Sequence, residues 1–225
     1  MSDTSTISTG EQILPFYILC DESGSMGANG GIDAINRALP DVHSALASDP
    51  LVSDKARIGL IVFSDEAEEL MALTRAADVS AFPGVQAKGL TDYADAFTLL
   101  HSVVKRDITD LKAQGYKVFR PAVFFISDGE PSGAWRTEYD ALMADDAARP
   151  NIVAFGVDSA DITVMKEIAT VACYMSEDNA NPGPVLREIM KALTNSIITS
   201  TNAPTPQFIA PPAPDGCVAI PLDEM

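Results

Sequence analysis

Apolar and polar positions divide most of the chain into alternating buried strands and amphipathic helices. The run from Ile13 to Cys20 is almost wholly apolar and ends in a polar, glycine-bearing loop, which is typical of a strand covered on both faces in a parallel sheet. The apolar residues after that loop recur at steps of three and four, as on one face of a helix ending near residue 49: they are Ile32, Ile35, Leu39, Val42 and Leu46. The chain is therefore expected to open with a strand, a loop and a helix.

One pair of strands is expected to be antiparallel. Arg57 to Phe63 forms a second buried run, and the apolar run Ala67 to Leu73 follows after only three residues, 64–66. A parallel crossover needs about a dozen residues or more, so this short connection favours a hairpin.

The alternation continues to about residue 198. A long amphipathic helix begins near Tyr93 and closes at Gly115, and the strongest apolar run, Ala122 to Ile126, ends in a polar turn. The remaining expected elements are helices at 138–148, 162–170 and 184–198 and strands at 152–157 and 173–175. This order predicts an α/β fold with a doubly wound, mostly parallel six-stranded sheet, one antiparallel edge strand and helices on both faces.

The chain of 225 residues is long enough for one sizeable core and does not require a second domain. Residues 1–10 are polar and expected to be disordered, and residues 11–200 are expected to form the domain. Residues 201–225 are rich in proline, which favours an extended tail or linker. Such a tail could bring Asp215, Asp223 or Glu224 to the ligand-binding edge of the sheet, whereas the alternative is a plain linker or docking segment.

Composition narrows the classes of partner. With 47% hydrophobic residues and a formal net charge of -17, the chain is not disordered throughout and would be repelled by nucleic acid and anionic membranes. It lacks a secretory signal pattern and an apolar stretch of the roughly 18 residues that span a bilayer, so a cytoplasmic protein is expected. The three cysteines and two histidines are too scattered for a disulfide framework or a zinc site. The oligomeric state is left open.

Three polar loops gather oxygen-bearing side chains at strand or helix ends. The loop at 21–25 follows the first strand, the loop at 89–92 opens the long helix, and the loop at 127–129 follows the strongest apolar run. In a doubly wound sheet the carboxyl ends of the strands meet at one crevice, so these loops are expected to surround one point. We interpret Asp21, Ser23 and Ser25 as part of a site for a hard divalent cation.

The ligand chemistry selects among metals. Oxygen ligands suit Mg²⁺, Mn²⁺ or Ca²⁺, whereas Zn²⁺ favours imidazole or thiolate. Few carboxylates and several hydroxyls leave room for retained waters, which suits Mg²⁺ or Mn²⁺ better than a Ca²⁺ cage of denser acid. Mg²⁺ is the expected cofactor, with Mn²⁺ or Ca²⁺ as alternatives. Without a metal, the same residues would form an N-capping, turn-forming loop.

Three motifs together resemble the metal-ion-dependent adhesion site of von Willebrand factor A (vWA) domains: Asp-x-Ser-x-Ser at 21–25, Gly-x-Thr at 89–91 and Asp-Gly at 128–129. The resemblance covers about residues 11–198 and implies a Rossmann-like vWA fold. It also implies that hydroxyl oxygens come from Ser23, Ser25 and Thr91, while Asp21 and Asp128 hold coordinating waters. One coordination position would stay open for an Asp or Glu carboxylate of a protein partner.

The resemblance implies a function as a metal-dependent protein-interaction module. The stretch Ile-Ser-Asp-Gly-Glu-Pro at 126–131 is most similar to bacterial intracellular vWA proteins linked to tellurite resistance and stress response. No nucleophile, base or acid beyond the ligands is apparent, so an enzyme is not expected. Around the site, Asp92 is expected to cap the long helix, Glu22 and Glu130 to face solvent, and Trp135 to pack or line the rim.

Two alternative functions remain. Haloacid-dehalogenase phosphatases also place an Asp loop after the first strand and use Mg²⁺, but they require a second Asp where this chain has Ser23. The other alternative is a metal-free scaffold that acts through its helices or tail. A P-loop or dinucleotide enzyme is disfavoured because neither glycine motif follows a strand.

Overall fold

The centre of the molecule is an eight-stranded sheet in the order β3-β2-β1-β5-β6-β7-β8, with β4 beside β1. The computed structural model describes residues 11–177, 180–205 and 207–222. The strands are β1 (Gln12–Asp21), β2 (Ala56–Phe63), β3 (Ala67–Arg75), β4 (Lys117–Val118), β5 (Ala122–Ser127), β6 (Asn151–Gly156), β7 (Ala172–Ser176) and β8 (Cys217–Ile220). β3 and β8 run antiparallel to their neighbours at the two edges, and the other pairings are parallel.

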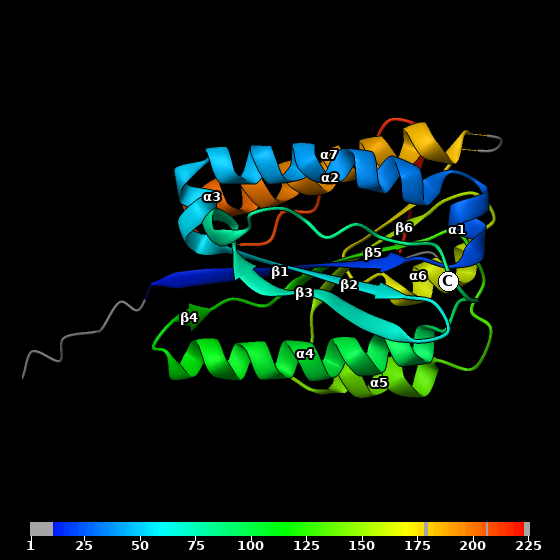
Figure 1. The fold of residues 1–225 in the computed structure, drawn as a ribbon. Coiled ribbons are helices and arrows are strands. Elements are labelled where there is room, and N and C mark those ends of the chain that lie inside the picture. The colour runs from blue at the N-terminus through cyan, green and yellow to red at the C-terminus, as the bar shows by residue number, and fades with distance from the viewer. Residues whose placement is uncertain (1–10, 178–179, 206, 223–225) are drawn as a thin grey trace, which may run out of the picture.

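Helices cover both faces of the sheet. They are α1 (Gly24–Ala28), α2 (Gly31–Ser48), α3 (Pro50–Lys55), α4 (Tyr93–Ala113), α5 (Arg136–Ala144), α6 (Ile162–Ile168) and α7 (Pro182–Asn202), with a 3₁₀ turn η1 (Ala76–Asp78). α2, α3 and α7 pack on one face, and α4, α5 and α6 on the other (Figure 1). Phe16 and Ile18 of β1 join the first core, and Tyr17 and Leu19 join the second. This two-sided burial explains the unbroken apolar run of β1.

The expected fold class is confirmed, but the expectation of six strands and one antiparallel edge is wrong. The two additional strands are β4, which has two residues, and β8, which has four. Strands this short carry too few alternating positions to give a recognisable pattern. The second antiparallel edge follows from β8, which pairs with β7.

The described residues after α7 pack against the sheet and differ from the expected extended linker. The ring of Phe208 lies 6.1 Å from that of Phe124 in β5. Ser196 in α7 donates a hydrogen bond to the carbonyl of Ile209 at 2.5 Å, and the Tyr174 hydroxyl donates to the carbonyl of Pro211. Proline prevents helix here but permits extended chain that bonds through its carbonyls. Residues 1–10 and the acids Asp223 and Glu224 lie outside the described residues.

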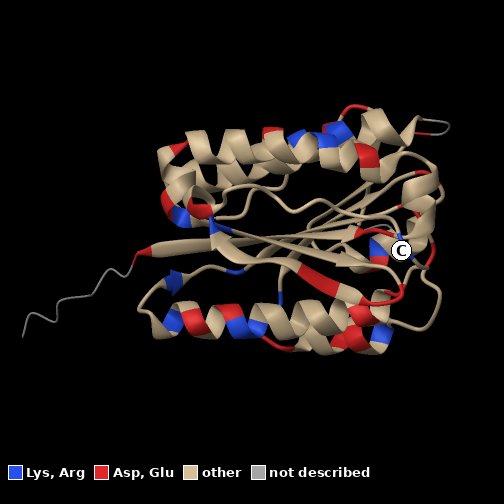
Figure 2. Cartoon of the chain, in the orientation of Figure 1, with Lys and Arg blue, Asp and Glu red and all other residues tan. Residues whose placement is uncertain are grey.

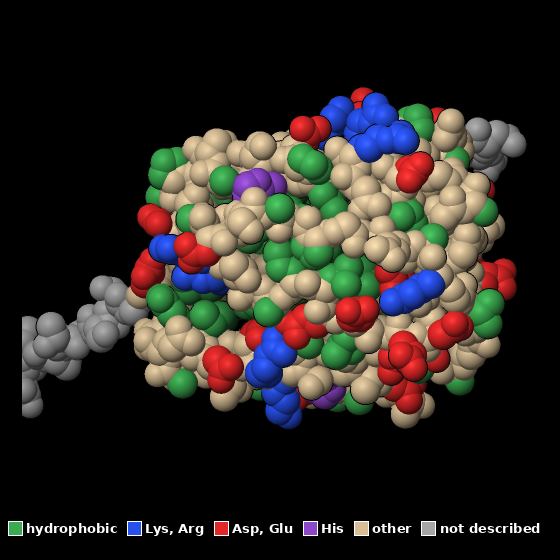
Figure 3. Space-filling view, in the orientation of Figure 1, with side chains coloured by type: hydrophobic (Ala, Val, Ile, Leu, Met, Phe, Trp, Pro, Cys, Tyr) green, Lys and Arg blue, Asp and Glu red, His purple; other side chains and the backbone are tan. Residues whose placement is uncertain are grey.

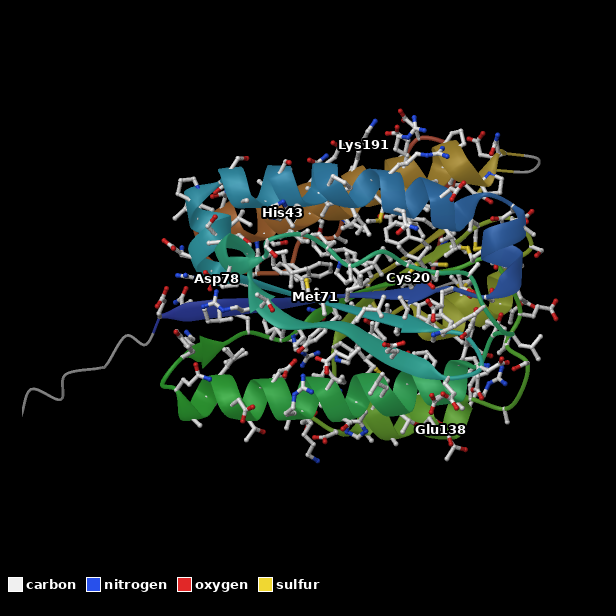
Figure 4. The ribbon with its side chains drawn as sticks, in the orientation of Figure 1. Cys20, His43, Met71, Asp78, Glu138 and Lys191 are labelled. Carbon is white, nitrogen blue, oxygen red and sulfur yellow. The ribbon has the colours of Figure 1, made fainter. Side chains whose placement is uncertain are left out.

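The charged residues are mostly acidic, with 32 Asp and Glu against 15 Lys and Arg; Figure 2 shows acidic residues in both helical layers and along the loops, and Figure 3 shows acidic side chains spread over one face of the molecule. All three cysteines are buried free thiols; Cys20, labelled in Figure 4, lies inside the molecule, one residue before Asp21. No helix among the described residues is long and apolar enough to cross a membrane.

Candidate metal centre

The register of β1 and β5 brings two of the three polar loops together. These strands are adjacent and parallel, with Cys20 opposite Ile126. The next residues, Asp21 and Ser127, therefore leave the sheet side by side, and the Ser127 hydroxyl donates to Asp21 Oδ2 at 2.5 Å. Asp21 Oδ1 accepts a second hydrogen bond from the backbone N–H of Ser23 at 2.8 Å, which fixes the turn that leads into α1.

The two serines of the first loop lie between the two aspartates. The Oγ atoms of Ser23 and Ser25 are 3.0 Å apart, and Ser25 Oγ donates to Asp128 Oδ1 at 2.8 Å. Asp21 and Asp128 are fully buried, whereas Ser25 is exposed. The carboxylates thus lie beneath the exposed side chain of Ser25, while Ser23 is itself buried.

Thr91 completes the site from the loop before α4. Thr91 lines a pocket of about 350 Å³ together with Ser23 and Ser25, and the other lining residues are Gly24, Gly89, Leu90, Glu130 and Ser132. Its backbone carbonyl accepts hydrogen bonds from the backbone N–H and the hydroxyl of Ser132, at 2.8 and 2.9 Å. The structure therefore brings all five residues singled out from the sequence to one edge of the sheet.

The donor set fits a hard cation. Two adjacent ligands of an octahedral Mg²⁺ ion, each about 2.1 Å from the metal, lie about 3.0 Å apart, and the Ser23 and Ser25 oxygens are 3.0 Å apart. Within the described residues, no group of three or more His, Cys, Asp and Glu side chains converges in a way that could hold a metal. Metal binding at this site would therefore depend on hydroxyl oxygens and water, as Mg²⁺ and Mn²⁺ accept.

The two buried carboxylates lack a positive partner in the described part of the chain. Burial raises the pKa of Asp21 to about 6 although Ser127 and Ser23 donate to it. Burial also raises the pKa of Asp128, against the hydrogen bonds from Ser25 and Asn29. Neutral donors only partly replace the hydration that a carboxylate loses on burial, so the site favours a nearby cation.

Four residues outside the expected ligand set also shape the site, and of these only Ser127 lies in one of the three loops indicated by the sequence. Ser127 holds Asp21, and Tyr93 donates to the Ser127 hydroxyl at 2.8 Å. Asn29 donates to Asp128 Oδ2 at 2.6 Å, and Lys88 lies 3.0 Å from a Glu22 carboxylate oxygen. Ser127 had one local signal, its place directly before Asp128, whereas Asn29, Tyr93 and Lys88 act through partners distant in sequence.

The expectations for the neighbouring side chains had mixed outcomes. Asp92 caps α4, since its carboxylate accepts from the backbone N–H groups of Ala94 and Asp95, and Glu130 is exposed. The expectation that Glu22 faces solvent is wrong: its side chain is 2% exposed because it folds inward to the Lys88 ammonium. Trp135 is buried and packs on Tyr93 and Phe97.

The chain belongs to the von Willebrand factor type A domain family, whose model matches residues 16–130. Similar solved structures include a von Willebrand factor type A protein from Catenulispora acidiphila, at 14% identity and a TM-score of 0.62, covering 84% of this chain and 43% of that one. The open pilus adhesin SpaC from Lactobacillus rhamnosus GG has 14% identity and a TM-score of 0.63, covering 84% of this chain and 30% of that one.

A third similar structure is proximal thread matrix protein 1 from the mussel byssus, whose metal-ion-dependent adhesion motif is occupied by zinc. It has 14% identity and a TM-score of 0.55, covering 84% of this chain and 48% of that one. At these identities the similarity shows the fold, and this chain spans less than half the length of each of these structures. No curated protein sequence matches the chain.

Proposed function

We propose that the protein is a metal-dependent interaction module that binds an Asp or Glu side chain of a protein partner through Mg²⁺ or Mn²⁺. Ser23, Ser25 and Thr91 would ligate the cation, and Asp21 and Asp128 would hold its waters. The observation that carries the proposal is the pair of Ser23 and Ser25 oxygens, 3.0 Å apart above Asp128. A bound cation would supply the positive charge to which an incoming carboxylate is attracted.

The surroundings of the pocket favour binding over catalysis. The pocket is open to solvent and is lined by small residues, the exposed Leu90 and the acidic Glu130. Its polar groups hydrogen-bond to one another, and in the described part of the chain no histidine or lysine hydrogen-bonds to its hydroxyls as an activating base would. vWA domains are in general interaction modules, so we propose that the protein is not an enzyme.

Metal titration tests this function. At a concentration of about 100 times Kd, Mg²⁺ or Mn²⁺ should stabilise the fold by about 2.7 kcal/mol and raise the Tm by about 5–10 °C. The double variant Ser23→Ala, Ser25→Ala should lose this rise while keeping its Tm in EDTA within a few degrees. An equal rise in both proteins, or no rise in either, contradicts the proposal. Zn²⁺ and Ca²⁺ are tested in parallel, since a similar structure holds zinc.

We further propose a bacterial stress or tellurite-resistance system as the cytoplasmic setting, on the strength of the stretch from Ile126 to Pro131. Affinity capture from tellurite-treated cells, with and without EDTA, would identify the partner. Proteins captured by the wild type but lost with EDTA and with Asp21→Ala are those that depend on the metal. Capture that is insensitive to both would instead support a metal-free scaffold.

A further inference from the structure

The side chain of Asn29 contacts three segments: the start of α2, the loop after β5 that bears Asp128, and the loop after β6. Asn29 is the residue that ends α1, and its side-chain oxygen accepts from the backbone N–H of Gly31 at 2.9 Å, at the start of α2. Its amide nitrogen donates to Asp128 Oδ2 at 2.6 Å and reaches Asp158 Oδ2, in the loop after β6, at 3.3 Å. Figure 1 shows α1 between the end of β1 and the start of α2, beyond the carboxyl end of β1.

This contact fixes which oxygen of Asp128 faces the serines. Asp128 Oδ1 accepts from Ser25, and Asp128 Oδ2 accepts from Asn29. A carboxylate held at both oxygens cannot rotate about its terminal bond without losing a hydrogen bond. The backbone is held as well, because Ser159 Oγ donates to the carbonyl of Asp128 at 2.9 Å.

An amide suits this position better than a charged donor or an acid. Asp128 and Asp158 are both carboxylates, and the neutral amide supplies both of its N–H groups between them without cancelling the negative charge that a cation needs. A lysine there would compete with the metal, and an acid would add repulsion without donating. Asp158 has a left-handed φ of 53°, and its backbone N–H donates to Ser176 Oγ at 3.1 Å, which ties its loop to β7.

We propose that Asn29 is a positioning residue of the metal centre, which orients the carboxylate of Asp128 toward Ser25 and the cation. The inference rests on the proposed metal site. Partners of this kind, hydrogen-bonded to groups around a metal, typically contribute about 10- to 100-fold to metal affinity. Asn29 lies outside the three motifs found in the sequence, and it reaches the site only through the folded loops.

The test compares Mn²⁺ affinity, by calorimetry, among the wild type, Asn29→Ala and Asn29→Ser. Serine can still accept from the N–H of Gly31 through a short local turn, but its hydroxyl is too short to reach Asp128. Both variants should bind Mn²⁺ about 10-fold or more weakly. Asn29→Ser should keep a Tm in EDTA nearer the wild-type value, so it preserves the test if Asn29→Ala folds poorly.

A matched control comes from the opposite end of α2. Asn202 also donates its amide to a carboxylate, Asp49 Oδ2, at 2.8 Å, and the 18-residue helix α2, about 27 Å long, separates that pair from the metal centre. Asn202→Ala should leave Mn²⁺ affinity unchanged. Wild-type affinity in both Asn29 variants, or an equal loss in Asn202→Ala, would overturn the positioning role. Absence of Mn²⁺ binding by the wild type would instead overturn the proposed function on which it rests.

Discussion

At the scale of single residues, neutral hydrogen-bond donors hold the two buried aspartates of the candidate metal centre. Asp21 receives the Ser23 backbone N–H and the Ser127 hydroxyl, and Asp128 receives the Ser25 hydroxyl and the Asn29 amide. Such donors stabilise a carboxylate while leaving its charge uncancelled. The arrangement therefore fixes both side chains without removing their attraction for a cation.

The hydroxyl of Ser127 gives the first prediction. It donates to Asp21 and accepts from the buried Tyr93 hydroxyl, so Ser127→Ala leaves the buried Asp21 short of a donor, while Tyr93 can still donate to the carbonyl of Gly129 at 3.0 Å. We expect a loss of about 1–3 kcal/mol in the free energy of unfolding in EDTA and a metal affinity weaker by about 10-fold. Urea unfolding and calorimetry measure the two effects. Ser48→Ala, which removes an exposed hydroxyl bonded to the Ala45 carbonyl, should change neither.

The residues that the sequence indicated are those with local motifs. Asp21, Ser23, Ser25, Thr91 and Asp128 were found because they follow or precede recognisable elements, and their roles as ligands remain a prediction. Asn29 and Lys88 could not be found, since the partners of their side chains are set by which strands become neighbours. The inward orientation of Glu22 depends on the same long-range packing.

At the scale of elements, the loop before α4 is braced on both sides. The carbonyl of Gly89 accepts from the N–H of Gly24 at 3.1 Å, and the N–H of Lys88 donates to the carbonyl of Glu22 at 2.8 Å. The N–H of Leu90 donates to Asp65 at 3.0 Å. These bonds join the loop to the end of β1 and to the turn after β2, and they place Thr91 in the pocket.

Gly89 gives the second prediction. It has a φ of 65°, and a Cβ atom there would lie 2.4 Å from Asp65 Oδ2, so Gly89→Ala should both strain the backbone and displace the loop. The matched control, Gly115→Ala, shares a positive φ of 90° with no atom nearby and should cost only about 1–2 kcal/mol. We expect a larger stability loss in Gly89→Ala, and a metal affinity that falls only in that variant. Equal effects of the two substitutions would argue against the bracing role.

The packing of α4 on β1 gives a third prediction, which concerns pH. The buried Tyr17 hydroxyl donates to Asp107 Oδ2 at 2.8 Å, and burial raises the pKa of Asp107 despite the donors Arg106 and Tyr17. With a raised pKa, the folded state takes up a proton more readily than the unfolded state. The contribution of Asp107 to stability therefore falls as the pH rises from its unfolded pKa to its higher folded pKa.

Tyr17→Phe removes a donor to the charged form, so it should raise the pKa of Asp107 further and make that fall in stability steeper. The substitution should cost about 1.5–3 kcal/mol at pH 7 and clearly less at about pH 3, which lies below the ordinary pKa of an aspartate and so below the raised pKa of Asp107. Urea unfolding at the two pH values measures the difference. Tyr116→Phe is the control, since the Tyr116 hydroxyl makes no hydrogen bond among the described residues. A cost of Tyr17→Phe that does not vary with pH would contradict this account.

Long, strongly patterned elements could be predicted from the sequence, as could the short β7, whereas α1, β4 and β8 could not. β1, β2, α2 and α4 were expected close to their observed bounds, because the two strands are unbroken apolar runs and the two helices each bury one face with a clear period. α1 has five residues and β4 has two, too few for a period to appear. β8 was missed because its residues follow a proline-rich stretch and become a strand only through pairing with the edge of β7.

At the scale of the whole molecule, the described residues after α7 form one edge of the sheet, and β3 forms the other. β8 covers the edge of β7, and Phe208 and Ala210 pack on the core between the sheet and α7. The candidate metal centre lies at the carboxyl ends of β1 and β5, and β6 and β7 separate β5 from β8. The segment is therefore expected to support the stability of the fold without contacting the metal.

This separation gives the last prediction. Phe208→Ala should lower the free energy of unfolding by about 2–3 kcal/mol through lost packing, and a chain ending at Ala203 should lose more and associate through the uncovered edge of β7. A chain ending at Pro221, which keeps β8, should retain the wild-type Tm. Thermal unfolding measures the losses, light scattering measures association, and Mn²⁺ affinity should be unchanged in Phe208→Ala.

If the segment were a plain linker, all three variants would unfold at the wild-type temperature. If it supplied a carboxylate to the metal, the chain ending at Pro221, which lacks Asp223 and Glu224, would bind an acidic partner more tightly than the wild type.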